Sequence, residues 1–247
     1  MFESLQAASA DAILGLIAEH KNDTRPEKID LGVGVYRTAA GETPVLEVVK
    51  KAEQILVDTQ DSKTYLGTAG AADFNAAMQA LTFGGAAPGD RLTTIQTPGG
   101  SGSLRVAAGM IMRASPDVSV WASEPTWANH VPLLGGAGLK LKSHPYYDTE
   151  NHVIKIDEML AALSTAPAGD VVLLHACCHN PSGLDPSRDD WKAITDLIVE
   201  RALVPFIDMA YQGFADNFDD DAFPVRHMAE RVPELIVATS CSKSFGL

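Results

Sequence analysis

Short apolar runs alternate with segments of helical periodicity through most of this chain, and that alternation restricts the possible folds more than any other feature. Six runs predict strands at residues 92–95, 118–122, 139–141, 171–175, 204–208 and 235–239. Helical periodicity between them predicts helices at residues 104–113, 157–163 and 189–201. Such alternation is typical of a mostly parallel sheet flanked by helices. Several runs are almost entirely apolar, as expected of strands buried on both faces. The predicted fold class is therefore α/β.

The N-terminal part has a different pattern. Two helices are expected at residues 11–21 and 44–57, with an extended Gly-rich segment at 29–35 between them. We therefore expect residues 1–45 to form an N-terminal arm and the start of a small domain. Residues 46–247 are expected to form a larger domain that contains the sheet.

Composition excludes some classes of function. The formal net charge of −13 argues against a nucleic-acid surface, which needs clustered Lys and Arg. No apolar stretch approaches the roughly 20 residues that span a bilayer, so no membrane association is expected. Three cysteines offer no disulfide framework, which makes the cytoplasm the expected location.

Polar and aromatic residues follow the predicted strands. Ligands of open parallel sheets bind outside the carboxyl ends of the strands, so these segments are the natural place to look for a site. The segments are residues 96–102, 123–130, 176–183, 208–211 and 240–243. Their convergence on one sheet edge predicts a binding site more strongly than any single motif does.

Three of these features allow two interpretations each. The small residues 99–102 open a helix and could bind an anion, but plain Gly-rich turns are about as common. Asp208 ends an apolar strand and needs a cation, which could be a protonated ring nitrogen or simply a nearby Arg. Trp127 could stack on an aromatic cofactor or belong to the core.

Two other patterns do not support the function that they first suggest. The segment 175–179 contains two His and two Cys, but their spacing is not that of a zinc site, and no metal is expected there. Residues 32–34 read Gly-Val-Gly, which could suggest a nicotinamide-binding loop. The third Gly of that motif is missing, so an oxidoreductase is a weak alternative.

Taken together, the motifs resemble those of one family. The matching segments are residues 31–37, 64–67, 98–105, 125–130, 178–183, 208–214 and 240–247. In this order they resemble the class I, fold-type I aminotransferases that depend on pyridoxal 5'-phosphate (PLP), in the aspartate/aromatic amino acid subgroup. The resemblance implies that residues 46–247 are the PLP-binding large domain.

The resemblance also implies roles for individual residues around the PLP ring. Lys243 would form the Schiff base with PLP and transfer the proton during catalysis. Asp208 would pair with the pyridinium nitrogen, and Asn180 and Tyr211 would hydrogen-bond the phenolic oxygen. Trp127 would stack on the ring and, with Asn180, contact the substrate.

Other implied roles lie farther from the ring. The PLP phosphate would be bound by Gly100, Ser101, Gly102 and Ser240, with Tyr65 supplied by a neighbouring subunit of a homodimer that shares its active sites. The supporting and substrate-closing residues would be His130, His175 and Gly34.

The implied reaction is transamination between an L-amino acid, aspartate or aromatic, and a 2-oxo acid such as 2-oxoglutarate. The family's Arg residues for phosphate and substrate would lie past Leu247, so we expect a C-terminally truncated chain that lacks the small domain and turns over poorly. A non-catalytic PLP-binding fragment, or a lyase or decarboxylase on the same fold, remain alternatives.

Overall fold

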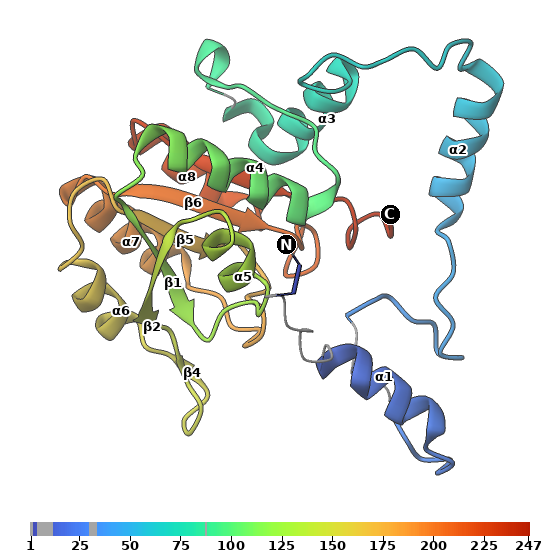
Figure 1. Ribbon diagram of the computed structural model, residues 1–247, viewed down its shortest axis with the longest axis horizontal. Coiled ribbons are helices and arrows are strands. Elements are labelled where there is room, and N and C mark those ends of the chain that lie inside the picture. The colour runs from blue at the N-terminus through green and yellow to red at the C-terminus, as the bar shows by residue number, and fades with distance from the viewer. Residues whose placement is uncertain (1, 4–11, 30–33, 87) are drawn as a thin grey trace.

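The computed structural model describes residues 2–3, 12–29, 34–86 and 88–247. A five-stranded parallel sheet in the order β2-β1-β5-β6-β7 lies at its centre (Figure 1). The strands are β1 (Ser119–Glu124), β2 (Lys140–Pro145), β5 (Val171–His175), β6 (Val204–Met209) and β7 (Ile236–Thr239), and a separate antiparallel pair is formed by β3 (Tyr147–Asp148) and β4 (Val153–Ile154). The predicted α/β fold class and five of the six predicted strands are confirmed.

Helices cover both faces of this sheet because successive strand residues point to opposite sides. On β1, Trp121 belongs to one buried cluster, while Val120 and Ala122 belong to the other. The Val120 face is covered by α4 (Gly99–Ala114) and α5 (His130–Gly135). The Trp121 face is covered by α6 (Ile156–Leu163), α7 (Arg188–Glu200) and α8 (Phe223–Arg231).

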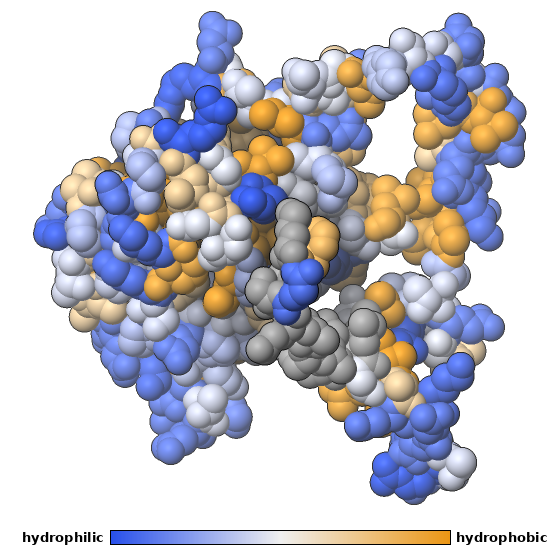
Figure 2. Space-filling model, in the orientation of Figure 1, coloured by the Kyte–Doolittle hydropathy of each residue, from blue (hydrophilic) through white to orange (hydrophobic). Residues whose placement is uncertain are grey.

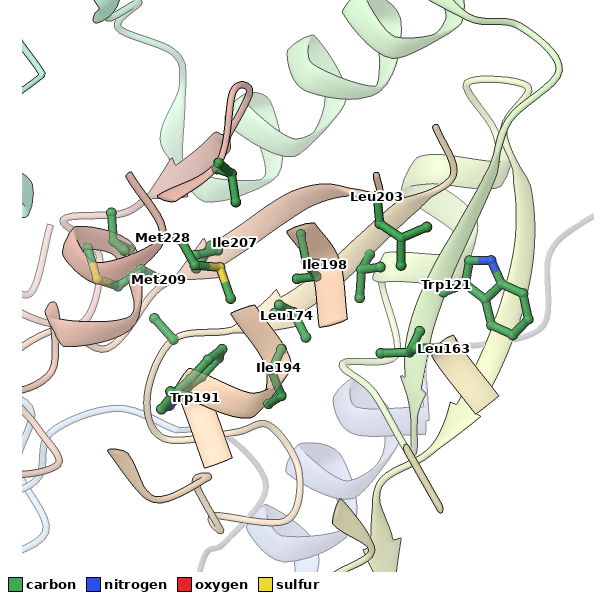
Figure 3. Packing of buried hydrophobic residues seen from close by; sticks show 14 of the residues in the cluster. Trp121, Leu163, Leu174, Trp191, Ile194, Ile198, Leu203, Ile207, Met209 and Met228 are labelled. Atoms are coloured by element: carbon green, nitrogen blue, oxygen red, sulfur yellow. The ribbon is translucent and has the colours of Figure 1, made fainter. Parts of the chain in front are cut away.

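The core under α7 shows how the sheet and the helices interlock. Ile194 and Ile198 of α7 are buried against Leu174 of β5 and Ile207 of β6 (Figure 3). Trp191, near the start of α7, belongs to the same cluster (Figure 3). It lies towards the carboxyl end of the sheet, beside His175 and His179. Close packing of this kind fixes the strand ends and hence the geometry of whatever the following loops carry.

The predicted strand at residues 92–95 is wrong. This segment is extended, and Asn75 Nδ2 donates to Thr94 O at 3.2 Å, but it does not pair with a strand of the sheet. A groove of about 780 Å³ separates it from β7, lined by Leu92, Thr94 and Ile95 on one side and Ile236 and Val237 on the other. The segment has the apolar pattern of a strand, but a strand also needs a neighbour with which to pair.

The N-terminal part lies beside this sheet (Figure 1). It contains α1 (Ala12–Asn22), α2 (Glu47–Thr59) and α3 (Ala72–Phe83), followed by the short helices η1 (Gly84–Ala86) and η2 (Gly89–Arg91). Apolar side chains on α2 remain at the surface, as Figure 2 shows in orange. They are Val48, Ile55, Leu56 and Val57, each more than half exposed.

None of the helices in the described part of the chain is both long and apolar enough to cross a membrane.

Candidate active site

The direction of the strand connections reverses between β1 and β5. The chain runs outward from β1 to β2 and then returns to β5 on the other side of β1. Loops that leave two such neighbouring strands diverge to opposite sides, and ligands of α/β sheets bind at this switch point. Residues 125–130 follow β1 and residues 176–183 follow β5, and they flank this switch point at the carboxyl edge of the sheet. Thr126 and Asn180 both hydrogen-bond His175 there.

Asp208, on β6 next to His175 of β5, is fixed by a buried histidine. His130 Nε2 lies 2.9 Å from Asp208 Oδ2, and the His130 side chain is completely buried. No described residue hydrogen-bonds the other carboxylate oxygen, Oδ1. Asp208 is thus held in a fixed orientation at the carboxyl edge of the sheet.

A hydrogen-bond chain fixes the tautomer of His130. The backbone N–H of Asn180 donates to His175 Nδ1 at 3.1 Å, so the proton of a neutral His175 lies on Nε2 and is donated to Thr126 Oγ1 at 3.3 Å. The Thr126 hydroxyl then donates to His130 Nδ1 at 2.8 Å. His130 is left with its proton on Nε2, where it donates to Asp208.

Burial disfavours the charged form of His175 and of its neighbour His179. The pKa of His175 is lowered well below its ordinary value, first by burial and then by the neighbouring histidines. Burial also lowers the pKa of His179 to about 4. The His179 ring stacks on His175 at 4.3 Å and on Tyr146 at 3.9 Å between centroids, while Ser123 and Ser182 hydrogen-bond its two nitrogens.

Lys243 lies in the turn after β7, opposite Tyr211 in the turn after β6. The Lys243 ammonium nitrogen is 5.6 Å from the centre of the Tyr211 ring. Burial raises the pKa of the Tyr211 hydroxyl, and the nearby Asn180 side chain partly offsets this effect. Residues more than 60 positions apart in sequence thus share one small region.

Trp127 is partly buried at the edge of the core. Its ring meets His130 edge-on, with centroids 5.3 Å apart and planes at 88°. It also packs against the apolar cluster under α4. Both earlier interpretations of Trp127, as a core residue and as a residue of the site, are therefore compatible with its position.

The Gly-rich start of α4 approaches Ser240. A Cβ atom added to Gly100 would lie 3.3 Å from Ser240 Cβ and 3.6 Å from its Oγ. Free backbone N–H groups at a helix N-terminus and an adjacent hydroxyl together favour a bound anion. Gly102 is also within this first turn, and the Ser101 side chain is exposed to solvent there.

Two expected site residues lie apart from this group. Tyr65 is 99% exposed. Around Gly34, a Cβ added to the glycine would have no atom of another described residue within 4 Å, apart from its two chain neighbours. Gly32 and Val33, considered above for a nicotinamide loop, lie outside the described residues.

Other residues of the site were not singled out from the sequence. Thr126 joins the two histidines, and its only signal was its position in the segment between β1 and His130. His179 belongs to the segment 175–179, for which no metal is expected, and its ring stacks on that of His175. Neither role can be read without knowing which loops meet.

The arrangement fits a phosphorylated aromatic cation. A helix N-terminus with Ser240 suits the phosphate, the free oxygen of Asp208 suits a ring N–H, and Lys243 offers an amine near Tyr211. An open parallel sheet with such groups at its carboxyl edge defines a cofactor-binding α/β protein.

Comparison with known proteins supports this class. The profile of the family described as "Aminotransferase class I and II" matches residues 26–247. The chain belongs to this family. It is 47% identical over 250 residues to an aspartate aminotransferase of Salmonella typhi, and 47% identical over 249 residues to an aromatic-amino-acid aminotransferase of Pseudomonas aeruginosa.

The matches cover the whole of this chain but 63% and 62% of these two relatives, so the chain spans less than two thirds of their length. The fold agrees closely with that of an aromatic-amino-acid aminotransferase from Burkholderia pseudomallei covalently bound to pyridoxal phosphate. The TM-score is 0.97 at 39% identity, over the whole of this chain and 63% of that one.

Proposed function

We propose that this chain forms the PLP-binding part of an aspartate or aromatic-amino-acid aminotransferase, with Lys243 as the residue that binds PLP covalently. Residues 46–247 would form the PLP-binding domain, and residues 1–45 the N-terminal arm and the start of a small domain. The observation that carries the proposal is the meeting of Lys243 with Tyr211 at the sheet edge where His130 orients Asp208.

Each part of the cofactor has a partner in this chain. Gly100, Ser101, Gly102 and Ser240 would hold the phosphate, and Asp208 would pair with the ring nitrogen. Trp127 would cover the ring, while Asn180 and Tyr211 would bind its phenolic oxygen. When bound, PLP supplies a conjugated ring that accepts electrons from the substrate.

The residues themselves then account for positioning and proton transfer. Nζ of Lys243 would carry the proton that leaves the substrate Cα. The Tyr211 hydroxyl is protonated at neutral pH and can act as a donor, and burial raises its pKa further. The His175–Thr126–His130 hydrogen-bond chain orients Asp208.

The substrates proposed are an L-amino acid, aspartate or aromatic, and a 2-oxo acid such as 2-oxoglutarate. The two relatives at 47% identity bear one name of each kind, so identity alone does not choose between them. Transamination is favoured over a lyase or decarboxylase reaction because the relatives and solved structures at high coverage are aminotransferases.

Borohydride trapping tests the assignment of Lys243. The chain is incubated with PLP, reduced, digested and analysed by mass spectrometry, and the label is expected on the Lys243 peptide. Lys243→Ala should lose the label, whereas Lys192→Ala, which removes an exposed lysine of α7, should keep it. Labelling spread over surface lysines in both variants would refute the assignment.

A second measurement addresses the amino-group donor. Aspartate and phenylalanine are added separately to the PLP-loaded chain, and the absorbance is followed for conversion of bound PLP to its amine form. Loading at Lys243 without conversion by either amino acid would support the alternative of a PLP-binding fragment without catalysis.

We also propose a cytoplasmic homodimer. Exposed apolar side chains on α2 and the fully exposed ring of Tyr65 offer a surface that a second copy could cover. Sedimentation measurements would give the oligomeric state. Ile55→Asp, which charges the exposed α2 surface, should shift the chain towards monomer, and a monomeric wild-type chain would contradict the proposal.

A further inference from the structure

Asp185 holds the loop that carries Asn180. Its Oδ2 accepts a hydrogen bond from the backbone N–H of Cys178 at 2.6 Å, and its Oδ1 accepts one from the N–H of His179 at 2.9 Å. These are the two residues directly before Asn180. Both oxygens of one carboxylate are therefore used to fix the backbone that leads to the Asn180 side chain.

Asp221 does the same for the loop that carries Tyr211. Its Oδ2 accepts from the N–H of Gly213 at 2.8 Å and of Ala215 at 3.1 Å, and its Oδ1 accepts from the N–H of Asp216 at 2.9 Å. Asp221 is only 4% exposed. Gly213, two residues after Tyr211, has a φ of +97°, so this turn needs both a glycine and an acceptor for its N–H groups.

The two carboxylates lie in one electrostatic environment. Burial raises the pKa of Asp185, and the charge of Asp221 acts in the same direction, while the N–H donors of Cys178 and His179 oppose both. Burial of a carboxylate without a cation or a hydrogen-bond donor beside it would lower the stability of the fold, and no described cation lies against Asp185. The backbone N–H groups that donate to Asp185 and Asp221 compensate for this burial.

We propose that Asp185 and Asp221 are positioning residues that together set the geometry of the Asn180–Tyr211 pair. The inference deepens the proposed function and rests on it. The pair is assigned to the phenolic oxygen of PLP. Donors at that oxygen withdraw negative charge and lower the proton affinity of the lysine-linked nitrogen. The two aspartates, which do not touch PLP, would therefore tune this proton affinity through two loops.

A spectroscopic titration tests the proposal. Asp185→Asn and Asp221→Asn keep the side-chain shape, but the new amide group turns an N–H₂ towards a backbone donor. In the PLP-loaded chain, the pKa read from the absorbance of lysine-linked PLP should rise by roughly 0.5–1 unit in each variant, in the same direction as in Tyr211→Phe. Asp189→Asn removes an exposed carboxylate of α7 and serves as the matched control with no shift.

Further variants separate positioning from general stability. Urea unfolding shows whether each variant folds. If an Asn variant does not fold, Asp185→Glu and Asp221→Glu keep the charge but move it by one methylene, and they should shift the absorbance pKa in the same direction by less. Because both residues act on one pair of donors, the double Asn variant should differ from the sum of the single shifts.

The outcomes distinguish this inference from the function on which it rests. If wild type never shows the absorbance of lysine-linked PLP, the proposed function fails. If wild type shows it, and folded Asp185 and Asp221 variants titrate as wild type does, the two aspartates are structural only and the inference is overturned.

Discussion

Two isoleucines, one on α7 and one on α2, show that the sheet domain and the N-terminal helix α2 differ in how far their apolar side chains are buried. Ile194 on α7 is 0% exposed and packs under the sheet, whereas Ile55 on α2 is 61% exposed. Both residues occur in helices of 13 residues, so helix length does not explain the difference. What differs is the presence of a facing layer, which the sheet provides for α7 and which no described part of the chain provides for the exposed side of α2.

The largest effect on stability is expected for Ile194→Ala. Removal of a fully buried isoleucine loses its burial and leaves a cavity, which costs about 2–5 kcal/mol. Urea unfolding followed by far-ultraviolet circular dichroism would measure the free energy of unfolding. A loss below about 1 kcal/mol would mean that the core under α7 relaxes freely, against close packing with Leu174 and Ile207.

How much the sequence alone could predict differs between the same two regions. The strands from residue 118 onward were predicted because their apolar pattern and their burial agree. The site was predicted as a convergence because parallel strands present all their carboxyl ends at one edge. Asp208 and Lys243 both lie at that edge, at the ends of β6 and β7.

The remaining features depended on pairings that a pattern does not reveal. Residues 92–95 have the composition of a strand, but strand formation depends on a neighbour, and a groove lies where one would be. In the sequence, Asp185 and Asp221 cannot be told apart from ordinary loop carboxylates, because their hydrogen-bond partners are backbone N–H groups. A backbone donor has no signature in the amino-acid sequence.

The buried histidines predict an intermediate effect, which depends on pH. Since the pKa of His179 is about 4 in the folded chain and 6.5 ordinarily, the unfolded chain takes up a proton that the folded chain refuses. The contribution of a neutral His179 to the free energy of unfolding is therefore fully present above about pH 6.5 and is lost as the pH falls towards 4. One such histidine contributes about 3 kcal/mol to that loss over the whole interval.

Urea unfolding at several pH values between 4.5 and 7 would check this. His179→Asn should flatten the dependence of the unfolding free energy on pH, although it lowers stability at neutral pH, and the exposed His152→Asn is the matched control. An unchanged slope in His179→Asn would show that His179 is protonated as readily in the folded chain as in the unfolded one.

The smallest effect is expected where the comparison began. Ile55→Ala removes the same atoms as Ile194→Ala, but from a side chain that is already mostly in water, and alanine is the better helix former. In a monomeric sample the free energy of unfolding should change by less than about 0.5 kcal/mol. A cost that grows with protein concentration would instead show that a second copy covers α2, because association adds to the stability of the form that it binds. A large cost independent of concentration would mean that α2 packs within its own chain, and the contrast between the two isoleucines would no longer hold.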